Sequence, residues 1–380
     1  MIYFDNSATT KTSPTVAAKI YENLTDDNAF GNPGSLHKLG SKASSLYSKA
    51  RMSLADNLGC KTSELFFTSC GTESANTAIL GFMARNVRNG NKIISTKTEH
   101  KATLEVLNKL SKEGYNVVYL PVKKDGKPDL QMLENELDSE TALMCFTHVN
   151  NETGSILPLK EITDIRKKKN PKTALYLDCV QSMGKLDIRL NEFGVDMASF
   201  SGHKIHAVKG VGLLYVKAGI RIEPLILGGG QQDNMRSGTQ SIMLAQSIDF
   251  ALSEALENHD QSLKNVEAIN SYLREELTRR EAQILSPDDA LPYVLNVSFK
   301  GFESENMLHC LEMYDIYVST VSACSSKQKK VSYVLLEAGV DRKTAANAVR
   351  LSFSRYNTMA EAEEFIKAID EIYKKYLVKR

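Results

Sequence analysis

The chain has 380 residues, enough for one large domain with a smaller one beside it. Its 47 Lys and Arg residues balance 46 Asp and Glu residues to a formal net charge of +1, which argues against a nucleic-acid-binding protein. No segment has the roughly 18 uninterrupted apolar residues of a membrane span, and the first residues lack a signal-peptide pattern. We therefore expect a cytoplasmic protein with no membrane partner and no direct nucleic-acid partner.

The six cysteines include no CxxC pair and no metal-ligand spacing, so we predict reduced thiols and no metal site. They are Cys60, Cys70, Cys145, Cys179, Cys310 and Cys324. All except Cys324 lie in or beside apolar segments, where a buried, unreactive thiol is expected.

In chain order, the first predicted helix covers residues 41–58, whose apolar residues share one face and which Gly59 follows as a favourable terminator. Short apolar runs then predict strands at residues 65–67, 92–95, 116–120, 143–146, 174–177, 196–200 and 211–216. Helical segments are predicted between them at residues 102–110, 130–137 and 159–168. We interpret the basic run 166–169 as the solvated end of the last one. This alternation predicts an α/β fold with a mostly parallel, doubly wound sheet.

After about residue 246 the pattern changes to long helices at residues 247–256 and 262–280, with a short strand at 293–298. A last helix is predicted to start at Thr358, with Glu361 in the position of a capping box. We therefore predict two domains. They are a large domain of residues 16–255 and a smaller α+β domain of residues 1–15 and 256–380.

Five polar clusters each follow a predicted strand. The first lies in residues 68–74, where the free amides of Gly71 and Thr72 at a helix N-terminus would bind an anion such as a phosphate. A plain Ser or Thr helix cap would give the same pattern. The cluster matches neither a P-loop nor a dinucleotide fingerprint, which argues against ATP and NAD.

The other four clusters are centred on His100, Asn151, Asp178 and Lys204. A carboxylate at the end of a buried strand needs a positive partner, such as a protonated pyridine ring, unless Asp178 simply caps the next helix. A desolvated lysine can lose its proton and form a Schiff base, although Lys204 alone would also fit a solvated loop. Because the carboxyl ends of parallel strands share one edge, we expect all five clusters in one crevice.

Taken together, these residues resemble class V pyridoxal-phosphate enzymes of the cysteine desulfurase group (NifS/IscS-like), which have fold type I. The resemblance extends from residues 5–10 to residues 350–352. It rests on the motifs Thr-Glu-Ser at 72–74, His-Val-Asn-Asn-Glu at 148–152, Asp-x-x-Gln-x-x-Gly-Lys at 178–185, Ser-x-His-Lys at 201–204 and Arg-Ser-Gly-Thr at 236–239.

The resemblance implies pyridoxal 5′-phosphate as the cofactor, held as a Schiff base by Lys204. Asp178 would pair with the pyridinium nitrogen, Gln181 would contact the ring hydroxyl, and His100 would stack on the ring. Asn151 would lie near cofactor and substrate. The implied phosphate ligands are Gly71, Thr72, Ser201, His203 and, from the second subunit of a homodimer, Thr239.

Arg350 would bind the substrate carboxylate, since a planar guanidinium can do so through two parallel hydrogen bonds. An ordinary salt-bridge arginine is the alternative at this position. The implied substrate is L-cysteine, and the implied catalytic residues are Lys204, which would also take up the substrate Cα proton, His100 and Cys324.

Cys324 lies in a polar, small-residue stretch, residues 317–331, that reads as an exposed loop with lysines close by. Such a thiol has more thiolate character than a buried one, although a passive surface cysteine is the alternative. The sequence Ser-Ala-Cys-Ser-Ser resembles the persulfide loop of the longer-loop, group I desulfurases. This implies conversion of L-cysteine to L-alanine with a persulfide on Cys324, for transfer to an iron–sulfur scaffold or a tRNA-thiolation enzyme.

The sequence departs from the family pattern at three places, and two alternatives stay open. Residues 205–210 lack the usual Gly-Pro, Cys70 replaces a usual glycine, and Thr320-Val321 replaces a usual Ser-Gly. The first alternative is another class V enzyme, such as a selenocysteine lyase or an aminotransferase. The second is a non-catalytic binding or scaffold member of the fold.

Overall fold

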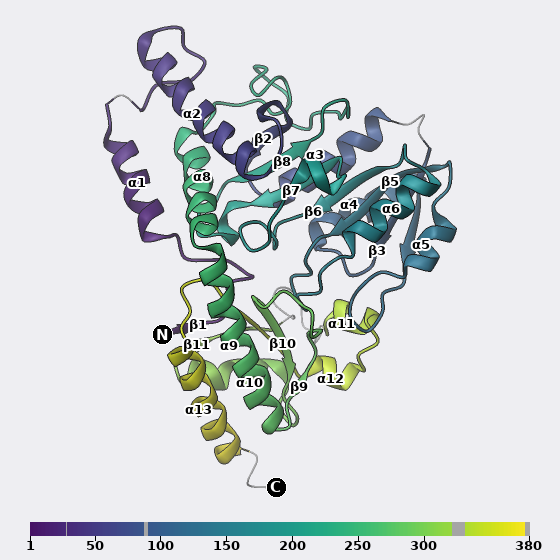
Figure 1. Ribbon diagram of the computed structural model, residues 1–380, viewed down its shortest axis with the longest axis vertical. Coiled ribbons are helices and arrows are strands. Elements are labelled where there is room, and N and C mark those ends of the chain that lie inside the picture. The colour runs from purple at the N-terminus through teal and green to yellow at the C-terminus, as the bar shows by residue number, and fades with distance from the viewer. Residues whose placement is uncertain (28, 87–89, 321–330, 377–380) are drawn as a thin grey trace.

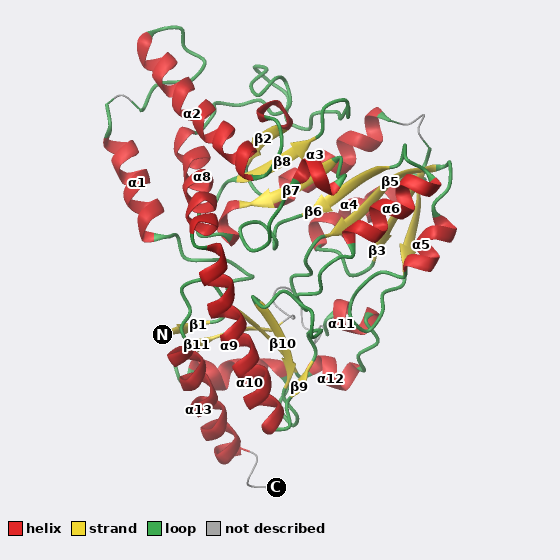
Figure 2. Ribbon diagram, in the orientation of Figure 1, coloured by secondary structure: helices red, strands yellow, loops and turns green. Residues whose placement is uncertain are grey.

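The structure is a computed structural model that describes residues 1–27, 29–86, 90–320 and 331–376. A large unit built on a seven-stranded sheet occupies the upper part of Figure 1, and a smaller unit built on a four-stranded sheet lies below it. The N-terminus belongs to the lower unit. Figure 2 shows helices packed around both sheets. None of the described helices is both long and apolar enough to cross a lipid bilayer.

The large sheet has the strand order β2-β8-β7-β6-β5-β3-β4. Its strands are β2 (Leu65–Thr68), β3 (Lys92–Thr96), β4 (Asn116–Leu120), β5 (Thr141–Thr147), β6 (Ala174–Asp178), β7 (Met197–Ser201) and β8 (Gly212–Val216). Only β8 is antiparallel to its neighbours, β2 and β7, so β2 runs parallel to the rest. This confirms the predicted α/β fold with a mostly parallel sheet.

Both faces of this sheet are buried. Along β5, Met144 and Phe146 face one hydrophobic cluster while Leu143 and Cys145 face another, as the twofold repeat of a strand requires. Helices α1 (Pro14–Thr25), α2 (Lys38–Asn57), α5 (Leu130–Glu136), α6 (Leu159–Lys169) and α8 (Ile242–Glu257) pack on the first face. Helices α3 (Gly71–Arg85) and α4 (Lys101–Lys112) cover the second. The sheet is therefore doubly wound.

The lower unit has a separate core. Its antiparallel sheet, β12-β13-β10-β9, consists of β9 (Gln283–Ile284), β10 (Val294–Ser298), β12 (Ser319–Thr320) and β13 (Ala348–Ser352). Strand β1 (Ile2–Tyr3) pairs in parallel with β11 (Ile316–Tyr317). The helices are α9 (His259–Arg279), α10 (Ser304–Glu312), α11 (Tyr333–Glu337), α12 (Arg342–Ala346) and α13 (Met359–Tyr376).

The division of the chain at residues 15 and 255 stays a proposal, which the arrangement of the cores supports. Phe4 packs with Leu295, Phe353 and Phe365 in the core of the lower unit, so the first residues of the chain join its last third. Val16, by contrast, belongs to the cluster of the large sheet.

Local signals in the sequence predict the ends of most expected helices and strands to within a few residues of their positions in the structure. Gly59 has φ = 63° directly after α2, as expected of a left-handed helix terminator. One interpretation was wrong: Arg166 is not solvated but buried, where it pairs with Asp196 and donates to the carbonyl of Gly194. Only the lysines that follow it, residues 167–169, are exposed.

The capping box predicted before the last helix is present. The Thr358 amide donates to Glu361 Oε2 at 2.9 Å, and the Glu361 amide donates to Thr358 Oγ1 at 3.3 Å. Two amides of the first turn of α13 thereby find acceptors.

We expect Thr358→Ala to lower the free energy of unfolding by about 1 kcal/mol, because it leaves a helix-terminal amide without its acceptor. Urea unfolding measures this change. Thr278→Ala is the matched control, since that hydroxyl lies inside α9 and donates to the carbonyl of Arg274 instead of capping an amide. Equal losses in both variants would contradict the capping role.

Candidate active site

A cavity of about 360 Å³ opens at the carboxyl edge of the large sheet, where it faces β13 of the lower unit. Its walls come from the segments after five strands that run parallel, together with the N-terminal segment and one residue of β13. The lining residues are Ser7, Ala8, Cys70, Gly71, Thr72, His100, Ala102, Thr147, Val149, Asn151, Asp178, Val180, Gln181, Ser201, His203, Lys204 and Arg350.

The structure brings together all but two of the residues predicted for the site. The segment after each of β2, β3, β5, β6 and β7 contributes one of the five polar clusters, and Arg350 reaches them from β13. Thr239 instead lines a separate hollow of about 200 Å³ with Tyr47 and Arg236. Cys324 lies outside the described residues, so its placement stays a prediction.

Lys204 ends the short 3-10 turn η3 (Gly202–Lys204) that follows β7. Its Nζ lies 2.6 Å from the carbonyl oxygen of Ser7 and 2.7 Å from that of Ala8. Burial, helped by the nearby charge of Arg350, lowers the pKa of Lys204 to about 8. Part of the population is therefore a neutral amine near neutral pH, which can act as a nucleophile or as a base.

Asp178 is buried at the end of β6, and its Oδ1 accepts a hydrogen bond from the Val180 amide at 3.0 Å. Burial raises the pKa of this carboxyl, while His100 and Lys204 oppose that effect. A cationic ligand in the cavity would therefore stabilise the ionised form. The helix-cap alternative is wrong, because residues 180–185 after Asp178 form turns and not a helix, and the hydrogen bond to Val180 leaves the carboxylate on the cavity wall.

His100 and Gln181 are both held in fixed orientations. His100 precedes α4, and its Nδ1 accepts from the Ala102 amide at 3.1 Å, which places the proton of the neutral ring on Nε2. Burial lowers the pKa of His100, so the neutral form is favoured. Gln181 Nε2 donates to the Ser7 carbonyl at 3.0 Å. A flat, neutral ring and a fixed amide donor therefore face the same cavity.

The amino end of α3 forms the anion-binding part of the site. Its N-cap residue is Cys70, which provides no side-chain hydrogen bond, so a plain Ser or Thr cap is not what the structure shows. A Cβ on Gly71 would lie 2.8 Å from Val180 Cγ2, so glycine is the residue that fits. Gly71 and Thr72 of the first turn line the same cavity as Ser201 and His203, so free amides at a helix N-terminus lie beside these two side chains.

These residues fit pyridoxal 5′-phosphate. They provide a lysine of low pKa, a buried carboxylate that needs a cation, and a helix N-terminus suited to a phosphate, all on one cavity. Cys70 was expected to be buried and unreactive, but it is half-buried and lies on the cavity wall. Burial raises the pKa of Cys145, which matches the expected unreactive thiol.

Several residues on or beside the cavity carry no predicted role. Ser7 and Ala8 act through backbone carbonyls, so no side-chain signal identifies them. Glu99 and Glu152 are buried, and burial raises the pKa of each carboxyl to about 7. Their position beside His100 and Asn151 in the polar clusters was the available signal.

Lys185 is a further buried cation next to the site. Its Nζ donates to Gln181 Oε1 at 3.2 Å and lies 5.6 Å from the centre of the Tyr293 ring. Within the described part of the chain, no carboxylate lies at ion-pair distance from it. Burial therefore lowers the pKa of Lys185 to about 7.

Comparisons with known proteins agree on the family that this chain resembles. The family model described as aminotransferase class V matches residues 2–365. A NifS/IcsS protein homolog of Lactobacillus delbrueckii subsp. bulgaricus is 40% identical over 99% of this chain and 98% of its own length. A cysteine desulfurase IscS of Clostridium botulinum is 36% identical over 98% and 94%. A solved NifS-like protein matches with a TM-score of 0.93 and 39% identity, over 98% of this chain and 99% of its own.

Lys185→Met should change how stability depends on pH. Folding lowers the pKa of Lys185, so as the pH rises the folded protein loses this proton before the unfolded chain does. The buried positive charge therefore destabilises the fold fully below about pH 7. This destabilisation disappears near the pKa that the lysine has in the unfolded chain. The variant should therefore be most stabilised, relative to the unchanged protein, near pH 6. We expect that difference to shrink by on the order of 2 kcal/mol toward pH 9.5.

Urea unfolding at the two pH values measures this effect. Lys209→Met, at an exposed lysine in the same part of the chain, is the matched control and should leave the pH dependence unchanged. Parallel stability curves for Lys185→Met and the unchanged protein would contradict the assignment of a lowered pKa.

Proposed function

The chain belongs to the class V aminotransferase family as a pyridoxal-phosphate-dependent cysteine desulfurase of the NifS/IscS type, and on this premise we propose how its residues divide the reaction. L-cysteine loses its sulfur and leaves as L-alanine. The C–S bond of the substrate breaks, and a new S–S bond forms on Cys324. Cys324 loses its thiol proton in this step and alanine gains one proton, so the protons balance.

One observation carries this proposal. Lys204, Asp178 and the amino end of α3 lie on one cavity, so a single ligand can contact an amine, a carboxylate and free backbone amides at once. When bound, pyridoxal phosphate supplies an electron sink that labilises bonds at the substrate Cα and Cβ. Asp178 keeps that sink effective, because its negative charge favours a protonated ring nitrogen.

Lys204 moves protons as well as holding the cofactor. Its lowered pKa lets the released amine accept the Cα proton near neutral pH. The carbonyls of Ser7 and Ala8 orient Nζ through two hydrogen bonds, so the amine stays beside the cavity. His100, whose neutral form is favoured, would stack on the cofactor ring without adding a positive charge.

Arg350 binds the substrate carboxylate. It is buried and lies on the cavity wall, and Asn151 is beside it. A guanidinium can bind a carboxylate through two parallel hydrogen bonds, which fixes the substrate in one orientation. This arrangement favours an α-amino acid over a simple thiol as the substrate.

The working assembly in this proposal is a homodimer. Within a single chain, Thr239 lines a different hollow from the cofactor cavity, which agrees with the second-subunit role that the family resemblance implies for it. Cys324 passes its sulfur to an acceptor protein, an iron–sulfur scaffold or a tRNA-thiolation enzyme. A cytoplasmic location, inferred from the sequence, is part of the same proposal.

Cys324→Ala should abolish most alanine formation from L-cysteine, because the substrate sulfur then has no nucleophile to accept it. The measurement is alanine released in the presence of a thiol reductant. Cys310→Ala is the matched control, since Cys310 is a half-buried thiol on α10 and does not line the cavity. Undiminished alanine formation by Cys324→Ala would favour another class V enzyme.

Lys204→Ala should remove covalent cofactor binding, because among the described residues no other lysine lines this cavity. Borohydride reduces the lysine–cofactor linkage to a stable amine, so the near-ultraviolet absorbance that stays with the protein after denaturation reports this loss. Lys209→Ala, at an exposed lysine nearby, should retain the bound cofactor. Cofactor bound covalently to the Lys204→Ala protein would contradict the assignment.

A further inference from the structure

Residues 5–10 connect the lower unit to the large sheet directly at the cavity. The backbone of Asp5 pairs with Ser352 of β13, and the Ser7 amide donates to Ser352 Oγ at 2.8 Å. Farther along, the Thr10 amide donates to the carbonyl of His203 at 2.9 Å. These contacts fix the backbone of the segment on both sides of the site.

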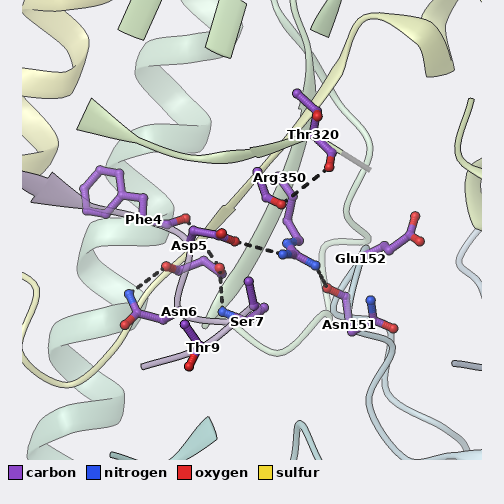
Figure 3. Close-up of polar contacts among 12 residues, drawn as sticks. Phe4, Asp5, Asn6, Ser7, Thr9, Asn151, Glu152, Thr320 and Arg350 are labelled. Carbon is purple, nitrogen blue, oxygen red and sulfur yellow. Dashed lines mark hydrogen bonds and ion pairs between the residues drawn. The ribbon is translucent and has the colours of Figure 1, made fainter. Parts of the chain in front are cut away.

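The Asp5 side chain forms an ion pair with Arg350, the residue proposed to bind the substrate. Asp5 Oδ1 lies 2.9 Å from Arg350 Nη2, and the exposed fractions of the two side chains are 21% and 9%. Arg350 Nη1 donates to the backbone carbonyl of Asn151 at 3.0 Å. Figure 3 shows the guanidinium held between Asp5 on one side and Asn151 on the other.

The two partners leave a defined part of the guanidinium for a ligand. Arg350 has five N–H groups, and one on each terminal nitrogen is already used. Its Nε is buried and, within the described residues, has no hydrogen-bond partner. Arg350 is on the cavity wall whereas Asp5 is not among its lining residues, so Asp5 contacts a ligand only through Arg350; its charge also raises the pKa of Lys204, against the effect of burial.

From this geometry we propose that Asp5 is a positioning residue that fixes the guanidinium of Arg350 in the orientation that receives the α-carboxylate of the substrate. The inference rests on the proposed function, because it takes Arg350 as the carboxylate-binding residue. A long arginine side chain loses rotamer freedom when it binds a ligand, and a buried ion pair removes that cost in advance.

Two opposite effects of Asp5 have to be separated. Its charge also neutralises part of the positive field of Arg350, which by itself would weaken the binding of an anionic substrate. The geometry favours orientation as the dominant effect, because the ion pair is largely buried and the guanidinium has a second fixed contact at Asn151.

The test compares L-cysteine with cysteamine, which lacks the carboxylate, in the cofactor-loaded protein. Binding of each is followed by the initial change in cofactor absorbance after rapid mixing, before turnover sets in. We expect Asp5→Asn to weaken L-cysteine binding about tenfold and to leave cysteamine binding unchanged, since about 1.4 kcal/mol corresponds to a factor of ten. In steady state, the KM for L-cysteine should rise with little change in kcat.

Two further variants sharpen the test. Asp5→Glu keeps the charge but moves the carboxylate by one methylene, so a positioning role predicts a selective loss of L-cysteine affinity here too. In an Arg350→Ala background, Asp5→Asn should cause no additional loss. Asp315→Asn is the matched control, because Asp315 pairs with the N-terminal ammonium near β1, away from the cavity.

Three results would overturn the proposal: equal losses for L-cysteine and cysteamine, tighter binding of L-cysteine by Asp5→Asn, or full affinity in both Asp5 variants. Alanine formation by the unchanged protein is measured in parallel. Its absence would refute the proposed function alone, since the comparison of the two ligands still tests Asp5.

Discussion

The active site depends on the removal of charged groups from water at the carboxyl edge of one sheet. Asp178, Lys204 and Arg350 lie on the same cavity wall, with Lys185 directly behind it. Burial disfavours the charged forms of Asp178, Lys185 and Lys204, so the pKa of the carboxyl rises and the pKa values of the two lysines fall. Each of these charges costs free energy to bury without a partner of opposite charge. A ligand with a cationic ring and an anionic phosphate would supply such partners.

Burial of these groups follows from the sheet itself. Because both faces of the central strands are covered by helices, chemical groups are accessible only where strands end. Strand β8 reverses direction between β2 and β7, yet β2 still points its carboxyl end to the same edge as its parallel partners. The amino end of α3 thus reaches the site that β6 and β7 supply with Asp178 and Lys204.

Much of this was predictable from local patterns. The apolar runs predict the strands. The polar residues immediately after these runs identify Asp178, His100 and Lys204 as candidates for one crevice. Contacts between distant segments carry no such pattern: Asp5 and Arg350 pair across 345 positions, and Ser7 contributes a carbonyl that any residue has. Arg166 was misread because a run of basic residues looks solvated, whereas a single member of it turns inward to Asp196.

The path of the first residues also has a consequence for how the protein is made. Asp5 and Ser7 leave the ribosome 345 residues before their partners on β13, Arg350 and Ser352. The central sheet and its lysine are complete long before that point. The substrate site therefore closes only after β13 has been made, and a chain that ends before β13 cannot form it.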